Sequence, residues 1–189
     1  MIYKYLYIDD ESKSVRDSFA QNLTNEFIKV DTMHVSNINL HNTEDVINLL
    51  SNYHGLLLDL RLDQIANEES KIKVPFTATV YAQHIRTLVT NGDICKDIPI
   101  VLFSTDDKLK KVYSIDLTSQ DLFDRYIEKT KIPYNAKSKL ISLAKGYIEI
   151  NNDKKIDKLL SLNNLDYIDD RLFARYSDGL LIPTHEYAQ

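Results

Sequence analysis

Short apolar runs alternate with helix-like segments along the first 150 residues of the chain. Runs of strand length, bounded by polar residues, lie at residues 4–8, 27–35, 55–59, 98–103 and 123–128. Segments with helical spacing of apolar residues lie at residues 12–26, 44–51, 78–91, 106–114 and 135–149. The alternation predicts five strand–helix units. The unbroken apolar run from Gly55 to Leu58 is typical of a strand buried on both faces of a parallel sheet.

Two of the predicted helices have defined starts or stops. The helix over 12–26 begins at Ser12, a residue type that caps helices, and its apolar positions recur at spacings of four: Val15, Phe19 and Leu23. The helix over 78–91 is stopped by Gly92, and its apolar positions are Val80, Ala82, Ile85, Leu88 and Val89. These residues are expected to face the sheet.

Strands and helices in this order predict an α/β domain over residues 1–150, with a parallel sheet covered by helices on both faces. Residues 151–189 follow a different pattern. Helical spacing recurs at 153–162 and 169–176, and Pro183 opens a segment that resembles the start of another helix. We interpret 151–189 as a helical C-terminal extension or the start of a further domain.

The composition of the chain indicates its cellular compartment and argues against one class of binding partner. The chain has 189 residues and one cysteine, Cys95, so an internal disulfide is impossible and a reducing, cytoplasmic setting is expected. No stretch reads as a membrane span or as a signal peptide. The net charge is −5, and no basic stripe with interleaved aromatic residues is present, which argues against nucleic acid as a partner.

Polar side chains follow four of the predicted strands at the point where each strand ends. Asp9 and Asp10 end the first run, Asp59 the third, Ser104 the fourth and Lys129 the fifth. Because ligands bind at the carboxyl ends of the strands in an open parallel sheet, these side chains are expected to converge at one edge. Singly, they would be ordinary turn, cap or surface residues; their order along the strands is what indicates a site.

The residue types suit Mg²⁺ and a phosphoryl group. Mg²⁺ prefers hard oxygen ligands, which Asp10 and Asp59 would supply directly, Asp9 through a water, and Arg61 through its backbone carbonyl. Asp59 could then attack phosphorus and form an aspartyl phosphate. Ser104 and Lys129 would contact the remaining phosphoryl oxygens, so catalysis would consist of positioning and charge stabilisation.

At these positions the chain resembles the receiver domain of bacterial two-component response regulators. The resemblance covers residues 1–150 and rests on four segments: Tyr7-Ile8-Asp9-Asp10-Glu11, Leu57-Leu58-Asp59-Leu60-Arg61-Leu62, Ile98-Pro99-Ile100-Val101-Leu102-Phe103-Ser104-Thr105 and Tyr126-Ile127-Glu128-Lys129. It implies a flavodoxin-like (βα)₅ three-layer sandwich with a five-stranded parallel sheet of order 2-1-3-4-5.

The resemblance also implies a function and roles for the residues. Asp59 would be the phosphoacceptor, with Asp9, Asp10 and the Arg61 carbonyl at Mg²⁺, and Ser104 and Tyr126 would form the switch. Such a domain accepts a phosphoryl group from a histidine kinase or phosphotransfer protein. It signals through a homodimer or a downstream effector protein. It is not an enzyme beyond its own phosphorylation and slow autodephosphorylation.

Three features depart from the family pattern. Thr130 follows Lys129, where the family has a proline in a cis bond. The segments 60–77 and 106–122 are longer than usual. Segment 60–77 would lie beside the site, and segment 106–122 lies where the output face of the family usually forms.

Two other functions fit parts of the pattern. A pseudo-receiver would keep the fold without phosphorylation, as a protein-interaction module or as the regulatory N-terminal domain of a larger effector. Such domains, however, often lose one of the residues that are all present here. A phosphohydrolase of the haloacid-dehalogenase kind also uses an aspartyl nucleophile, but it requires a second aspartate two residues later, where this chain has Arg61.

Overall fold

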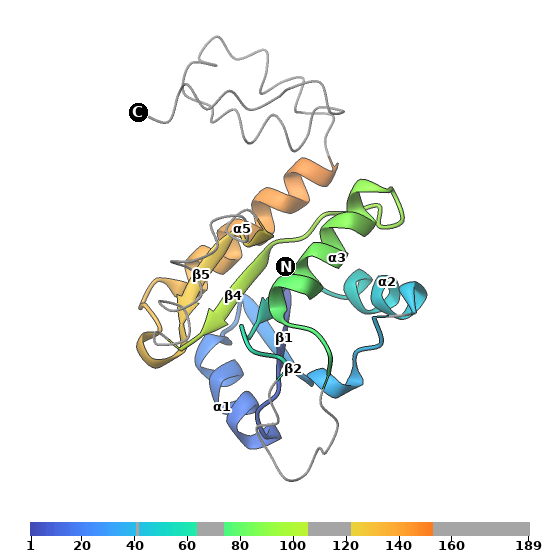
Figure 1. The fold of residues 1–189 in the computed structure, drawn as a ribbon. Coiled ribbons are helices and arrows are strands. Elements are labelled where there is room, and N and C mark those ends of the chain that lie inside the picture. Colours follow the sequence, from blue (N-terminus) through green and yellow to red (C-terminus); the bar gives the residue numbers. More distant parts are fainter. Residues whose placement is uncertain (41, 64–73, 106–121, 153–189) are drawn as a thin grey trace, which may run out of the picture. The chain divides into compact units, whose positions relative to one another are not determined.

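The computed structural model describes residues 1–40, 42–63, 74–105 and 122–152. Its first compact unit spans Met1–Ile148 and holds a sheet of five parallel strands. The strands are β1 (Tyr3–Asp9), β2 (Ile28–His34), β3 (Gly55–Leu58), β4 (Ile100–Ser104) and β5 (Arg125–Glu128). Their order is β2-β1-β3-β4-β5, which confirms the predicted order 2-1-3-4-5 (Figure 1).

Within the described residues, four α-helices cover the two faces of the sheet. They are α1 (Lys13–Leu23), α2 (Thr43–Ser51), α3 (Ala78–Thr90) and α5 (Ala136–Asn152). Short 3-10 turns, η1 (Val35–Asn37) and η3 (Lys129–Lys131), follow β2 and β5. The helix expected over 106–114 falls outside the described residues, and so does the extension expected over 151–189, apart from residues 151 and 152 at the end of α5. The helical extension stays a prediction.

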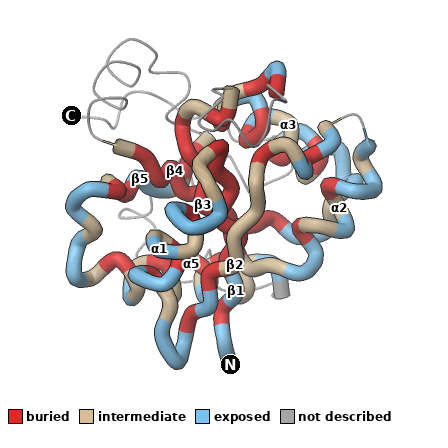
Figure 2. Tube along the Cα trace, turned by 90° about the horizontal axis from the view of Figure 1, so that it is seen from below, coloured by how far each residue is buried: buried red, intermediate tan, exposed pale blue. Residues whose placement is uncertain are grey.

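Alternating side chains of the strands build two cores, one on each face of the sheet. Leu6 and Ile8 of β1 pack on one face with residues of α2 and α3. Tyr5 and Tyr7 pack on the other face with residues of α1 and α5. Successive side chains of a strand point to opposite faces, so a strand with apolar residues at every position can be buried on both sides. The result is the three-layer sandwich that the sequence predicts, with buried strands at its centre (Figure 2).

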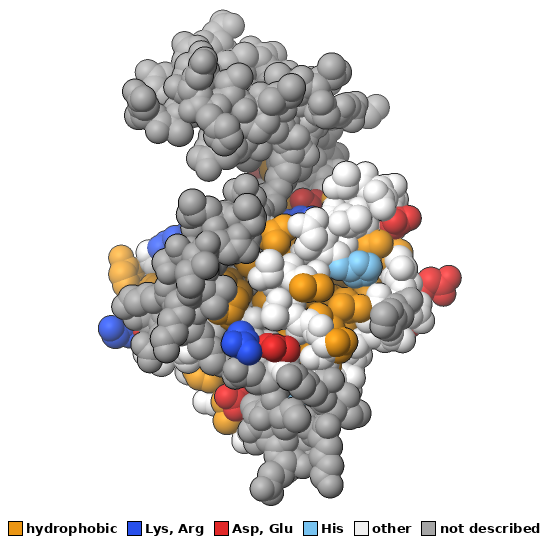
Figure 3. Space-filling view, in the orientation of Figure 1, with side chains coloured by type: hydrophobic (Ala, Val, Ile, Leu, Met, Phe, Trp, Pro, Cys, Tyr) orange, Lys and Arg blue, Asp and Glu red, His pale blue; other side chains and the backbone are white. Residues whose placement is uncertain are grey.

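Helix α1 buries most of the predicted face but not all of it: Leu23 is buried and Phe19 packs against the core, as predicted. Val15 is 37% exposed, whereas Arg16, Ala20 and Leu23 are buried. A spacing of four drifts around a helix of 3.6 residues per turn, so the buried stripe follows spacings of three and four instead. In α3, the predicted core position Val80 is likewise 52% exposed, and hydrophobic side chains reach the surface over this helix (Figure 3).

Several element ends also differ from the expected ones. Helix α1 ends at Leu23 because the Thr24 backbone is extended and begins the turn toward β2. Strand β4 begins at Ile100, directly after Pro99, which has no N–H to donate to a neighbouring strand. Among the described residues no peptide bond is cis, so the Lys129–Thr130 bond is trans.

A buried polar cluster joins four elements at the amino end of the sheet. This Arg86 cluster consists of Arg86, Asp97, Asp124 and Tyr147. Arg86 of α3 donates to Asp97 and to the Ile98 carbonyl (3.0 Å), and its Nη2 lies 2.8 Å from Asp124 Oδ2. Asp124 also accepts from the Tyr147 hydroxyl of α5 and from the Ile100 amide of β4 (2.7 Å). The cluster therefore ties α3, β4, β5 and α5 together where β4 and β5 begin.

None of the helices in the described part of the chain combines the length and the apolar content that crossing a lipid bilayer requires.

Two glycines lead to opposite expectations for the same substitution. A Cβ built on Gly55 would lie 2.3 Å from Tyr5 Cε1, and the Tyr5 ring is fully buried with its hydroxyl on the Leu140 carbonyl. Gly55→Ala should therefore lower the free energy of unfolding by about 1–3 kcal/mol through overpacking.

Gly146 is the matched control, because it lies within α5 and a Cβ there meets no atom within 4 Å. Gly146→Ala should raise the free energy of unfolding by about 0.5–1 kcal/mol. Urea denaturation of both variants checks the pair. Equal effects of the two substitutions would contradict the Tyr5 contact.

Candidate functional site

The carboxyl ends of the strands bring the predicted residues together. Asp9 is the last residue of β1 and Ser104 the last of β4, while Asp59 directly follows β3 and Lys129 directly follows β5. The Asp59 amide still donates to the Ile8 carbonyl (3.0 Å), so the β1–β3 hydrogen-bonding pattern fixes where Asp59 starts. Carboxylate oxygens of Asp9, Asp10 and Asp59 all lie within 4.8 Å of one another.

Asp59 is held by three donors from three segments. Its Oδ1 accepts from Ser104 Oγ (3.1 Å) and from Lys129 Nζ (2.5 Å). Its Oδ2 accepts from the Arg61 amide (2.9 Å). The carboxylate is almost fully buried, at 1% exposure, and these donors replace the water that it loses.

Lys129 joins two of the carboxylates into one buried ion cluster. Its Nζ lies 2.6 Å from Asp9 Oδ2 as well as 2.5 Å from Asp59 Oδ1, and its side chain is 5% exposed. Burial alone would lower the pKa of Lys129, but the charges and hydrogen bonds of Asp59 and Asp9 outweigh it and raise this pKa. Burial would raise the pKa of Asp9, but the Lys129 ammonium lowers it below its usual range. Both groups are therefore charged at neutral pH.

Aromatic rings surround the ammonium of Lys129. The ring centroids of Tyr7, Phe19 and Phe103 lie 5.5, 5.7 and 5.8 Å from Nζ. A cation near the face of an aromatic ring is attracted by the ring quadrupole, and the attraction grows when the cation is desolvated. The rings of α1, β1 and β4 therefore help to keep a charged lysine in a buried position.

The acidic set has the donor chemistry of a Mg²⁺ site. Three carboxylates against one ammonium leave two negative charges, equal in magnitude to the charge of Mg²⁺. Oxygen ligands from one or two carboxylates, completed by water and a phosphate oxygen, are what Mg²⁺ ordinarily takes in proteins. Asp9, Asp10 and Asp59 thus fit the ion; the role of the Arg61 carbonyl stays a prediction.

Three residues near the site were not singled out by the sequence. The Tyr7 hydroxyl donates to Asp9 Oδ2. The buried Arg16 donates to the Glu11 carbonyl, next to the acidic pair. His34 lies opposite Asp9 on β2, with Nε2 3.2 Å from the Asp10 carbonyl oxygen. For Tyr7 a signal existed, because residues two apart on a strand share a face, which places its hydroxyl beside Asp9.

The tautomer of His34 follows from its neighbours. The Ser36 amide donates to Nδ1 (3.1 Å), so the ring hydrogen is on Nε2 and points to the Asp10 carbonyl. His34 therefore joins the end of β2 to the loop that carries Asp10.

Tyr126, the predicted switch aromatic, lies on the outer strand. It is 38% exposed and pairs in register with Leu102 of β4, while Ser104 pairs with Glu128. The structure therefore gives Tyr126 an outward position in this state, and Ser104 a position on Asp59.

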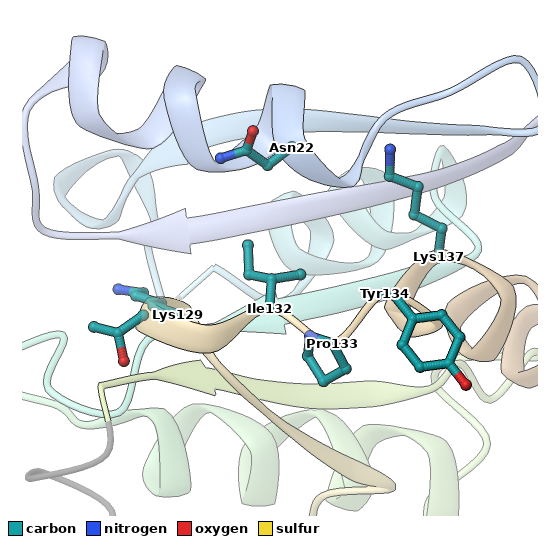
Figure 4. A pocket seen from close by; sticks show the side chains of 7 residues that line it. Asn22, Lys129, Ile132, Pro133, Tyr134 and Lys137 are labelled. Carbon is teal, nitrogen blue, oxygen red and sulfur yellow. The ribbon is translucent and has the colours of Figure 1, made fainter.

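A pocket opens beside the site, between α1 and the connection from β5 to α5. It has a volume of about 440 Å³ and is lined by Asn22, Lys129, Thr130, Ile132, Pro133, Tyr134 and Lys137 (Figure 4). Lys137 donates to the Thr24 carbonyl (3.2 Å) at the end of α1. The lining includes Lys129 but none of the three carboxylates, so the pocket adjoins the acidic site rather than containing it.

Comparisons with known proteins find similar structures but no similar sequences. No protein-family model matches the chain, and no curated protein does. A two-component response regulator of the LuxR family from an Aurantimonas species matches with a TM-score of 0.52 and 11% identity, over 84% of this chain and 99% of that one.

Two further solved structures match somewhat less well. A CheY-like response regulator receiver domain from Methylobacillus flagellatus has a TM-score of 0.49 and 15% identity, over 76% of this chain and 99% of that one. The chemotaxis response regulator CheY4 of Vibrio cholerae has a TM-score of 0.44 and 15% identity, over 77% and 98%.

The structural match establishes the fold. Sequence identities this low carry no information on function, which has to be argued from the residues of the site. The strand order, the two helical layers and the match to the Aurantimonas protein agree. The fold of this chain is that of a response regulator receiver domain.

Proposed function

We propose that the chain is a signalling switch that accepts a phosphoryl group on Asp59 in the presence of Mg²⁺. The observation that carries the proposal is the shared contact of Asp59 with Ser104 and Lys129, within reach of Asp9 and Asp10. A carboxylate, a hydroxyl and an ammonium are the three groups that transfer to aspartate requires: a nucleophile and two donors for the phosphoryl oxygens.

Asp9, Asp10 and Asp59 would hold the metal. Bound there, Mg²⁺ would offset the repulsion between the Asp59 carboxylate and the incoming phosphoryl group. The protein's own contribution is positional. The Arg61 amide and the β1–β3 hydrogen bond orient Asp59, and Glu11 donates its amide to Asp9 Oδ1 (3.0 Å).

The transfer itself makes one bond and breaks one. An Asp59 carboxylate oxygen bonds to phosphorus, while the bond from phosphorus to the donor atom breaks and its electron pair stays with the donor. Lys129 then turns from the carboxylates to a phosphoryl oxygen, and the Ser104 hydroxyl donates to another. Ser104 already donates to Asp59, so only its acceptor changes.

A phosphohistidine of a histidine kinase or phosphotransfer protein is the proposed donor. The output would pass through a homodimer or a downstream effector protein. A non-phosphorylated interaction module is the alternative, and the intact acidic set with its lysine argues against it.

Phosphoryl transfer to Asp59 can be tested by mass. With Mg²⁺ and acetyl phosphate, the wild-type chain should gain one phosphoryl group in intact-protein mass spectrometry, and Asp59→Asn should gain none. Asp63→Asn is the matched control, because Asp63 lies nearby but pairs with the Arg61 side chain (2.9 Å). Wild-type chain that remains unlabelled would favour the interaction module, and labelled Asp59→Asn would remove Asp59 from its role.

Lys129→Met tests whether the ammonium of Lys129 is needed for phosphoryl transfer but not for Mg²⁺ binding. Loss of a preorganised donor to the phosphoryl group should slow labelling by about 100-fold. Mg²⁺ affinity, measured by calorimetry, should not fall, because the ammonium that competes for Asp9 and Asp59 is gone. Lys131→Met, an exposed lysine two residues along, should leave both measurements unchanged. Unimpaired labelling of Lys129→Met would contradict its proposed role.

The switch should show as a change in the surroundings of Tyr126. Phosphorylation, or its mimic beryllofluoride with Mg²⁺, should turn this ring inward and reduce its exposure from 38%. Nuclear magnetic resonance of the tyrosine rings measures the change, with Tyr134, at 98% exposure, as an internal control. A Tyr126 ring that behaves like Tyr134 throughout would contradict a role in the switch.

A further inference from the structure

Tyr7 is a buried polar residue that the proposed transfer does not use. It lies on β1 two residues before Asp9, is 0% exposed, and donates its hydroxyl to Asp9 Oδ2. Its ring also faces the Lys129 ammonium, 5.5 Å from the centroid. One side chain thus contacts both Asp9 and Lys129.

The Asp9 carboxylate accepts hydrogen bonds on both of its oxygens. Its Oδ1 accepts from the backbone amide of Glu11 (3.0 Å), and its Oδ2 accepts from Lys129 Nζ (2.6 Å) and from Tyr7. Lys129 is the group that turns toward the phosphoryl oxygens in the proposed transfer. When it leaves, the Tyr7 hydroxyl is the donor that still holds Oδ2.

The Tyr7 hydroxyl is the donor in its hydrogen bond with Asp9, because an ionised carboxylate can only accept.

We propose that Tyr7 is a positioning residue that fixes the orientation of the Asp9 carboxylate for Mg²⁺ and releases Lys129 for the phosphoryl group. Hydrogen bonds from outer groups hold metal-binding side chains in place, and their loss commonly weakens metal binding by about 10–100-fold. The inference rests on the proposed Mg²⁺ site and adds a residue to it. Without the phenol, Asp9 Oδ2 loses one of its donors, and the lysine that remains on it becomes harder to release.

Tyr7→Phe tests the inference, and Tyr5→Phe is its control. Tyr5 lies on the same strand and the same face, is equally buried, and donates its hydroxyl to the Leu140 carbonyl (2.7 Å) instead of to the site. Each variant loses one buried hydroxyl, so both should lose some stability. Only Tyr7→Phe should raise the Mg²⁺ dissociation constant in calorimetry, by about tenfold, and slow labelling by acetyl phosphate.

A spectroscopic readout separates positioning from general damage. The chain has 12 tyrosines and no tryptophan, so its near-ultraviolet absorbance comes mainly from tyrosine. Mg²⁺ at Asp9 withdraws charge from the oxygen to which Tyr7 donates. Adding Mg²⁺ should therefore produce a tyrosine difference spectrum in the wild type and in Tyr5→Phe, and this spectrum should be absent from Tyr7→Phe.

The outcomes distinguish the inference from the function on which it rests. Wild type that binds Mg²⁺ and is labelled, beside a Tyr7→Phe variant with the same affinity and spectrum, overturns the role of Tyr7 alone. Wild type that neither binds Mg²⁺ nor is labelled overturns both.

If Tyr7→Phe fails to fold, the wild-type chain can be produced with 3-fluorotyrosine in place of tyrosine. Fluorine nuclear magnetic resonance of this protein then answers the same question. One tyrosine resonance should shift when Mg²⁺ is added, and the same resonance should be displaced in metal-free Asp9→Asn. If no resonance responds to both changes, the role of Tyr7 is overturned.

Discussion

The ion cluster of Lys129 with Asp9 and Asp59 is the constraint around which this end of the molecule is built. Two carboxylates at 0–1% exposure would be costly to bury without a cation, and the ammonium 2.5–2.6 Å from both supplies it. The three residues come from the ends of β1, β3 and β5, which are not adjacent in sequence. Their charges balance only when these strands end at one edge, so the electrostatics of the site and the register of the sheet depend on each other.

The two faces of the sheet are built from different chemistry. The face toward α2 and α3 is mainly aliphatic, whereas the face toward α1 and α5 receives Tyr5, Tyr7 and Phe103 from the strands. A buried tyrosine usually places its hydroxyl on a hydrogen-bond partner. Tyr5 finds one in the backbone of α5, and Tyr7 finds one in Asp9. The aromatic face thereby reaches the site, supplying both a hydrogen bond and the rings around Lys129.

The resemblance to receiver domains implied the sheet order, which the structure confirms. The strand–helix alternation was sufficient to predict the meeting of Asp9, Asp10, Asp59, Ser104 and Lys129, because it places strand ends at one edge. It was not sufficient for contacts that depend on tertiary packing. Val15 was expected to face the sheet but is 37% exposed, whereas Arg16 is buried and donates to the Glu11 carbonyl. The Arg86 cluster has no local signal at all: Arg86 and Asp124 are 38 residues apart.

Because of the Arg86 cluster, the amino and carboxyl edges of the sheet differ in how their buried charges are paired. At the amino edge, one guanidinium and two carboxylates bind α3, β4, β5 and α5 through buried hydrogen bonds, and separating any of them would leave a charge without a partner. At the carboxyl edge, an arriving cation and anion can exchange partners with Lys129 and Ser104 without leaving any charge unpaired. With the Arg86 cluster holding the first residues of β4 and β5, we expect any shift of these strands on phosphorylation to be largest at their other ends, next to Ser104 and Lys129.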